Sequence, residues 1–266
     1  PPRRCASPPL GAMPAAWQSQ FRGIPGCSTF SGVVLKFADI QAVIVDLDGT
    51  MVDTLGDFEV ALNRTMADLG LPGVDRAAVE RTVGKGSEHL IRSLLAEQLR
   101  RPEVIGCGQA CPALSVDALY ERAWGQYQHH YRSINGQFAD VFPGVFDGLQ
   151  GLRTAGLRLA CLTNKPLAFA QGLLQAKGLE EFFEKVFGGD SFERKKPDPM
   201  PLLKTCEALG TLPGQTLMVG DSQNDGIAAR AAGCPVALVT YGYNHGDPIA
   251  AAPHDRLIGS LTELLS

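Results

Sequence analysis

Short apolar segments alternate with amphipathic segments along most of the chain. The apolar segments predict buried strands at residues 40–47, 157–162, 186–187, 216–219 and 236–239. Apolar residues at helical spacing predict helices at residues 57–69, 74–83, 88–99, 116–132, 145–155, 167–177, 199–209 and 225–232. This alternation of strands and helices favours an α/β fold with a doubly wound, Rossmann-like parallel sheet and right-handed crossovers.

A long stretch of helices separates the first predicted strand from the second. Residues 56–141 contain no strand candidate. We therefore expect an all-helical cap at residues 56–141, inserted into an α/β core made of residues 39–55 and 142–266 and lying over the ends of its strands. A cap of this kind has to open and close, and the expected hinges are Gly56 and the pair Pro143-Gly144.

The first 38 residues differ in composition from the rest of the chain. They contain basic residues, several Ser and Pro, and no acidic residue before Asp39. This composition favours a disordered or atypical N-terminal extension at residues 1–38, and less strongly an organellar transit segment. An organellar location is expected only in the second case.

The overall composition is that of a globular protein, with 45% hydrophobic residues and a formal net charge of −4. The absence of a broad basic field argues against nucleic acid and anionic membrane as partners. The seven cysteines are odd in number and irregularly spaced, which favours a reducing, cytoplasmic environment. Cys107 and Cys111 lie in a segment without periodicity, residues 101–114, and are expected to be thiols of a loop. The expected assembly is a monomer or a small homo-oligomer.

The strongest polar motif follows the first predicted strand. Val43-Ile44-Val45 leads directly into Asp46-Leu47-Asp48-Gly49-Thr50. Parallel sheets bind ligands at the C-terminal ends of their strands, and acids at positions i and i+2 of an extended segment point the same way. Crowded carboxylates are costly unless a cation or a reaction uses them. Asp46 and Asp48 therefore predict a Mg²⁺ site and a carboxylate nucleophile.

Two further motifs are ambiguous when each is taken alone. Thr163 and Asn164 follow the second predicted strand, where a hydroxyl either binds a phosphoryl oxygen or caps the next helix. Lys196 begins the segment Lys196-Pro197-Asp198-Pro199. Its two prolines restrict the backbone and would position a cation, although a solvated lysine beside a turn has the same sequence.

The last motif, Asp221 and Asp225, follows the strand predicted at residues 216–219. These acids either face one cation together with Asp46 or stabilise the first turn of a helix. All four motifs lie at the C-terminal ends of strands of one predicted sheet, so we expect them to converge.

In this order, the motifs resemble those of the haloacid dehalogenase superfamily of phosphatases. The four family motifs are matched by residues 46–50, Thr163, Lys196 and residues 221–225, and the resemblance covers about residues 41–261. The combination of four motifs is far more specific than any one of them.

The resemblance implies roles for individual residues. It implies that Asp46 is the nucleophile and Asp48 the general acid and base, whose backbone carbonyl also binds the metal. Dehalogenases lack the second aspartate, so Asp48 favours phosphoryl chemistry. The resemblance further implies that Thr163 and Lys196 bind the phosphoryl group. It also implies four Mg²⁺ ligands, which are Asp46, Asp48, Asp221 and Asp225.

Within the superfamily, the chain is most similar to bacterial phosphoglycolate phosphatases. The similarity rests on Thr82-Val83-Gly84-Lys85-Gly86, Thr163-Asn164-Lys165-Pro166 and Tyr241-Gly242-Tyr243-Asn244-His245-Gly246. It implies Mg²⁺-dependent hydrolysis of a small phosphate monoester, 2-phosphoglycolate, through an aspartyl-phosphate. Asn164 and Lys85 are expected to contact the substrate.

Arg81, Lys85 and His89 are candidates for binding the carboxylate of that substrate, although charged residues on a cap helix usually face water. Tyr243 is expected to pack and His245 to be an ordinary loop residue. Other functions stay open: a β-phosphoglucomutase-like phosphotransferase, a broad sugar-phosphate or nucleotide phosphatase, and a non-catalytic metabolite-binding regulator. A dinucleotide-binding oxidoreductase is disfavoured because no G-x-G-x-x-G motif follows the first predicted strand.

Overall fold

A computed structural model of the chain describes residues 39–105 and 115–265. The predicted extension at residues 1–38 lies outside the described residues, as do Cys107 and Cys111. Among the described helices, none combines the length and the apolar character needed to cross a membrane.

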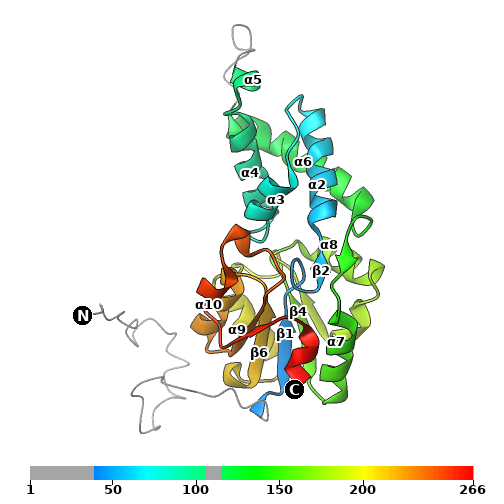
Figure 1. Cartoon of the computed structure of the whole chain (residues 1–266), viewed down its shortest axis with the longest axis vertical. Helices are drawn as coiled ribbons and strands as arrows, with labels where there is room; N and C mark the ends of the chain where they lie inside the picture. The colour runs from blue at the N-terminus through cyan, green and yellow to red at the C-terminus, as the bar shows by residue number, and fades with distance from the viewer. Residues whose placement is uncertain (1–38, 106–114, 266) are drawn as a thin grey trace, which may run out of the picture. The chain divides into compact units, whose positions relative to one another are not determined.

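The described part of the chain contains a six-stranded parallel sheet with the order β5-β4-β1-β6-β7-β8. Its strands β1, β4 and β6 are labelled in Figure 1. Its strands are β1 (Ala42–Val45), β4 (Arg158–Leu162), β5 (Lys185–Phe187), β6 (Thr216–Gly220), β7 (Val236–Val239) and β8 (Arg256–Ile258). Strand β1 is central, and its Ile44 pairs with Ala160 of β4 and Met218 of β6. The prediction of a doubly wound α/β fold is confirmed.

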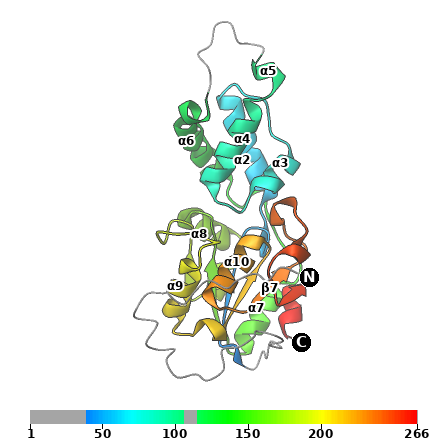
Figure 2. The ribbon, with the colours of Figure 1, turned by 90° about the vertical axis from the view of Figure 1, so that its left-hand side faces the viewer.

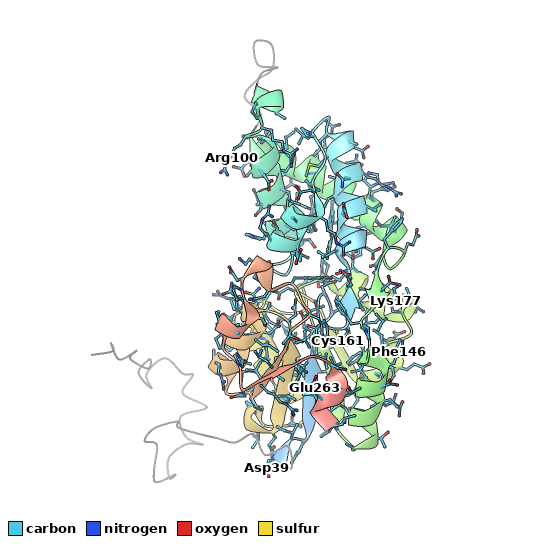
Figure 3. All side chains as sticks on the ribbon, in the orientation of Figure 1. Asp39, Arg100, Phe146, Cys161, Lys177 and Glu263 are labelled. Atoms are coloured by element: carbon cyan, nitrogen blue, oxygen red, sulfur yellow. The ribbon has the colours of Figure 1, made fainter. Side chains whose placement is uncertain are left out.

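Helices cover the sheet between successive strands. They are α7 (Val145–Thr154), α8 (Leu167–Ala176), α9 (Met200–Leu209) and α10 (Gln223–Ala232). Leu202 of α9 and Ala228 of α10 belong to the same buried cluster as Ile44 and Met218 of the sheet. Every residue of β1 is buried, as expected for a parallel strand covered on both faces. Cys161 of β4 lies among these strands (Figure 3).

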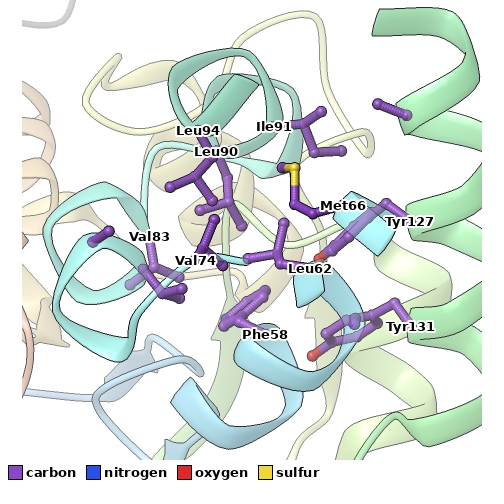
Figure 4. Packing of buried hydrophobic residues seen from close by; sticks show 14 of the residues in the cluster. Phe58, Leu62, Met66, Val74, Val83, Leu90, Ile91, Leu94, Tyr127 and Tyr131 are labelled. Carbon is purple, nitrogen blue, oxygen red and sulfur yellow. The ribbon is translucent and has the colours of Figure 1, made fainter. Parts of the chain in front are cut away.

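Four helices form a separate helical bundle, joined to the sheet by the connections before and after it (Figure 2). They are α2 (Leu55–Asp68), α3 (Arg76–Thr82), α4 (Ser87–Gln98) and α6 (Val116–Ile134). Their apolar faces pack into one hydrophobic cluster (Figure 4), whose members include Phe58, Leu62, Met66, Leu90, Ile91, Leu94, Tyr127 and Tyr131. Phe169 of α8 and Tyr243, which follows β7, also belong to this cluster.

The sequence pattern did not identify the shortest elements. Strands β2 (Val52–Asp53) and β3 (Asp140–Val141) form an antiparallel pair at the two chain connections between the sheet and the bundle. The expectation that residues 56–141 contain no strand was therefore wrong. Helix α5 (Pro102–Ile105) interrupts the loop that was expected at residues 101–114, and β8 was not predicted. Elements of two to four residues are too short to show a period.

Candidate active site

Polar side chains gather at the C-terminal end of β1, beside β6. From β1 the chain continues to β4 on one side, and from β6 it continues to β7 on the other side, so the direction of the connections reverses between these two strands. Asp46 follows β1 and Thr163 follows β4, the strand beside it. Such a switch point is the usual ligand-binding crevice of an open α/β sheet. It holds a small cavity of about 30 Å³, whose lining includes Asp46, Asp48, Thr163, Asn164, Lys196 and Asp225. The structure thus brings together the predicted residues from distant parts of the chain.

Three buried carboxylates form the acidic part of the site. Asp46, Asp221 and Asp225 each offer a carboxylate oxygen, and these oxygens all lie within 4.8 Å of one another. Burial raises the pKa of Asp46 to about 7, because the charge of Asp225 adds to desolvation while Lys196 only partly opposes it. The pKa of Asp221 is raised well above its usual range, first by burial and then by the charges of Asp225 and Asp46.

Lys196 supplies positive charge to this cluster from the loop before α9. Its Nζ lies 2.7 Å from Asp225 Oδ1 and 2.9 Å from Asp46 Oδ1, and it donates a hydrogen bond to Leu162 O at 2.8 Å. Burial by itself lowers the pKa of Lys196, but the charges of Asp225 and Asp46 outweigh burial and raise the pKa above its usual value. The ammonium therefore stays protonated.

The donor set of the cluster fits a divalent cation. A single ammonium beside three crowded carboxylates leaves negative charge without compensation. Carboxylate oxygens are the ligands that Mg²⁺ prefers. Asp46, Asp221 and Asp225 are thus able to hold such an ion. Within the described residues, the side chain of Asp48 is not part of this carboxylate cluster. The metal contact predicted for Asp48 involves its backbone carbonyl and stays a prediction.

Hydrogen bonds and a close-packed glycine hold Asp221 and Asp225 in position. Tyr243 N donates to Asp221 Oδ2 at 2.8 Å, and the backbone N and hydroxyl of Ser222 donate to Asp225 Oδ2 at 3.2 and 2.8 Å. Asp225 therefore stabilises the start of α10, which is one of its two predicted roles, and it also contacts Lys196. Gly49 has a φ of +81°, and a Cβ there would lie 2.2 Å from Asp221 Oδ2. Only glycine fits this turn.

Asp48 has a different environment. Its Oδ1 accepts hydrogen bonds from Lys165 Nζ and Thr54 Oγ1, each at 2.8 Å. Lys165 is buried and lines the cavity. The sequence pattern did not identify Lys165 as a site residue, although its place just after the β4 motif is a signal that was available.

Thr163 and Asn164 line the cavity and also make local contacts. Thr163 Oγ1 accepts a hydrogen bond from Lys165 N at 3.2 Å, within the loop before α8. It does not cap that helix, whose N-cap residue is Pro166. The Asn164 amide donates to Lys196 O at 2.8 Å and to Gly84 O at 3.1 Å. It therefore ties the loop that carries Lys196 to the helical bundle.

The loop that connects α3 and α4, residues 83–86, borders the cavity and is called the Gly84 loop below. Gly84 O also accepts from the Asn224 amide at 3.3 Å. His245 Nδ1 lies 2.8 Å from Val83 O, and His245 Nε2 lies 3.3 Å from the Asn224 amide nitrogen. A neutral imidazole that donates at Nδ1 and accepts at Nε2 satisfies both contacts. Burial, followed by the charge of Lys85, lowers the pKa of His245 and favours this neutral form.

The charged residues expected to bind the substrate from the bundle do not lie on this cavity. Its described lining includes Gly84, Gly86 and Ser87 but not Arg81, Lys85 or His89. Tyr243 Oη accepts from Thr54 N at 2.8 Å and donates to Asp53 Oδ1 at 2.7 Å. Tyr243 therefore links the segment after β7 to the chain entering α2.

Comparison with known proteins gives consistent matches. The sequence model described as "Haloacid dehalogenase-like hydrolase" matches residues 43–239. The phosphoglycolate phosphatase of Thiobacillus denitrificans is 39% identical over 224 residues, which cover 84% of this chain and 93% of that protein. The plasmid phosphoglycolate phosphatase of Cupriavidus necator is 43% identical over 223 residues, covering 84% of this chain and 90% of that protein.

Solved structures of proteins with related names also superpose on this chain. A predicted phosphoglycolate phosphatase from Haemophilus somnus 129PT superposes with a TM-score of 0.79 at 32% identity, covering 85% of this chain and 97% of the other. CbbY from Rhodobacter sphaeroides in complex with phosphate superposes with a TM-score of 0.66 at 27% identity, covering 85% and 96%.

Proposed function

The chain belongs to the haloacid dehalogenase-like hydrolase family and is a phosphoric monoester hydrolase, and we propose that it converts 2-phosphoglycolate to glycolate and phosphate. The convergence of Asp46, Asp48 and Lys196 on one small cavity carries the proposal. Relatives with 39% and 43% identity that are named phosphoglycolate phosphatases support this choice of substrate.

In the proposed reaction, an Asp46 carboxylate oxygen attacks phosphorus, the ester bond breaks, and an aspartyl-phosphate forms. A carboxylate that approaches a phosphate dianion meets repulsion of about 4 kcal/mol per charge pair near 4 Å at an effective dielectric constant of about 20. Lys196, 2.9 Å from Asp46, offsets part of this repulsion. A Mg²⁺ ion held by Asp46, Asp221 and Asp225 would supply the remaining neutralisation.

Asp48 is proposed to move the protons. It gives a proton to the leaving ester oxygen in the first step and takes one from the hydrolytic water in the second. Its contacts with Thr54 and Lys165 hold it beside the cavity and outside the carboxylate cluster. The hydroxyl of Thr163 and the ammonium of Lys196 are proposed to bind the oxygens of the transferred phosphoryl group.

The helical bundle is proposed to act as a cap, with boundaries at residues 56–141. The Gly84 loop, Phe58 and Leu90 already line the cavity from the bundle side. The β2–β3 pair, which joins both connections, would carry the motion, with Gly56 and Pro143-Gly144 as the hinges. Closure would exclude water from the phosphorylated Asp46 until glycolate has left.

A panel of phosphate esters tests the proposal. With Mg²⁺, we expect the highest kcat/KM for 2-phosphoglycolate when it is compared with glucose 1-phosphate, glucose 6-phosphate and nucleoside monophosphates. Removal of divalent cations by EDTA should abolish phosphate release, and added Mg²⁺ should restore it. Conversion of glucose 1-phosphate to glucose 6-phosphate without free phosphate would favour a phosphotransferase. Absence of turnover on every ester would favour a non-catalytic regulator.

The contacts of the Gly84 loop lead to a second prediction. Asn224→Ala should raise KM for 2-phosphoglycolate roughly tenfold with a smaller change in kcat, because it removes hydrogen bonds that contribute about 0.5–1.5 kcal/mol each. Steady-state kinetics checks this. Gln223→Ala is the matched control, since it truncates an amide in the same turn that does not contact Gly84. Equal KM values for the two variants would contradict a role of Asn224 in closing the loop.

A further inference from the structure

Lys165 is a second ammonium group in the cavity, separate from Lys196. Its side chain is 2% exposed, and its Nζ lies 2.8 Å from Asp48 Oδ1. The same Nζ lies 4.5 Å from the ring centroid of Phe58 and 4.8 Å from that of Tyr131. These rings belong to α2 and α6, so the helical bundle and the sheet together enclose this ammonium.

The surroundings of Lys165 leave part of its hydrogen-bonding capacity unused. An ammonium group has three N–H donors. Within the part of the chain that the structure describes, Asp48 is the one oxygen acceptor of Lys165 Nζ. The aromatic faces attract the positive charge but accept no conventional hydrogen bond. Because Lys165 lines the cavity, its remaining donors are available to a bound anion.

The position of Lys165 relative to Asp48 determines which part of a substrate it would meet. Asp48 is proposed to protonate the ester oxygen, so the group attached to that oxygen must lie beside Asp48. In 2-phosphoglycolate, a single methylene separates this oxygen from the carboxylate. Lys196 contacts Asp46 and Asp225 instead. Lys196 is therefore paired with Asp46, the proposed nucleophile, and Lys165 with Asp48, the proposed acid and base.

We infer that Lys165 is the specificity-determining residue that binds the carboxylate of the substrate. This inference rests on the proposed function, which it deepens. The preferred substrates are phosphate monoesters with an anionic group on the carbon next to the ester oxygen. From the sequence, Arg81, Lys85 and His89 of the bundle were expected to bind this carboxylate, but they do not line the described cavity. Carboxylate binding is assigned instead to a residue of the α/β core.

Replacement of Lys165 tests the inference through a ratio of two substrates. The pair is 2-phosphoglycolate and 2-hydroxyethyl phosphate, which carries a neutral hydroxymethyl group in place of the carboxylate. Lys165→Met should lower the ratio of their kcat/KM values roughly 10- to 100-fold, the range expected for a hydrogen bond to a charged group. Lys165→Arg should retain more of this ratio than Lys165→Met does. The exposed Lys195 gives the control, and Lys195→Met should leave the ratio unchanged.

A role of Lys165 limited to supporting Asp48 predicts a different result. In that case Lys165→Met slows both substrates equally, the ratio stays constant, and the inference is overturned while the proposed function stands. Wild-type protein gives an independent measurement if the variant does not fold. It should prefer 2-phosphoglycolate over 2-hydroxyethyl phosphate by more than roughly tenfold, and equal values would overturn the inference alone. A wild-type protein without activity on 2-phosphoglycolate would overturn the proposed function as well.

Discussion

Asp46→Asn is expected to abolish turnover of every phosphate ester while the protein remains folded. The amide is a far weaker nucleophile than the carboxylate, and loss of a covalent nucleophile lowers kcat by roughly 10⁵- to 10⁶-fold in comparable cases. The fold should persist because Asn has the same shape and removes one charge from a crowded acidic cluster. Burial already raises the pKa of Asp46 to about 7, so folding does not favour its ionised form. Phosphate release at saturating substrate measures the loss.

The covalent intermediate gives this prediction a second readout. After an acid quench during turnover, mass spectrometry of the wild-type protein should find a phosphoryl group on the peptide that contains Asp46. Asp46→Asn should show none, and its circular dichroism spectrum should match that of the parent. Asp117→Asn, at a side chain that is 88% exposed on α6, is the control and should keep full activity. Parental turnover by Asp46→Asn would reject Asp46 as the nucleophile.

The sheet was predictable because buried parallel strands appear in a sequence as apolar runs. The fully buried residues of β1 and β7 illustrate this. Elements that depend on context were missed. The two-residue strands β2 and β3 exist only because they pair with each other, and β8 forms a three-residue edge against β7. Neither local propensity nor period distinguishes such segments from loops.

The residues of the candidate site likewise fall into those that local sequence predicts and those that only the fold brings together. Asp46, Thr163, Lys196 and Asp225 were predictable as cavity residues because a position at a strand end or in the following loop can be read from local sequence. The contact of Lys165 with Asp48 spans 117 residues. The contact of Asn224 with Gly84 spans 140 residues. No local pattern encodes either contact. Arg81, Lys85 and His89 were predicted to bind the substrate because of their charge, but near the Gly84 loop the cavity is lined by small and apolar residues.

Lys196→Met is expected to lower the free energy of unfolding by about 3–5 kcal/mol when divalent cations are absent. The substitution keeps much of the side-chain volume but removes the ammonium that lies 2.7 Å from Asp225 and 2.9 Å from Asp46. Both carboxylates then stay buried without their cation, and the donor to Leu162 O is lost. Denaturant unfolding in EDTA measures the difference. Lys204→Met is the control, because that lysine is 55% exposed and its pair contributes little.

Addition of Mg²⁺ separates the structural role of Lys196 from its catalytic one. An ion that binds only the folded protein stabilises it by RT ln(1 + [L]/Kd). It should stabilise Lys196→Met by neutralising Asp46, Asp221 and Asp225, which share the proposed metal site. Turnover should nevertheless stay low, because no ammonium then faces the phosphoryl oxygens. Recovery of stability without activity would thus assign two functions to Lys196. A variant as stable as the parent in EDTA would show that the carboxylates do not depend on Lys196, and the charge balance proposed for this site would then be incorrect.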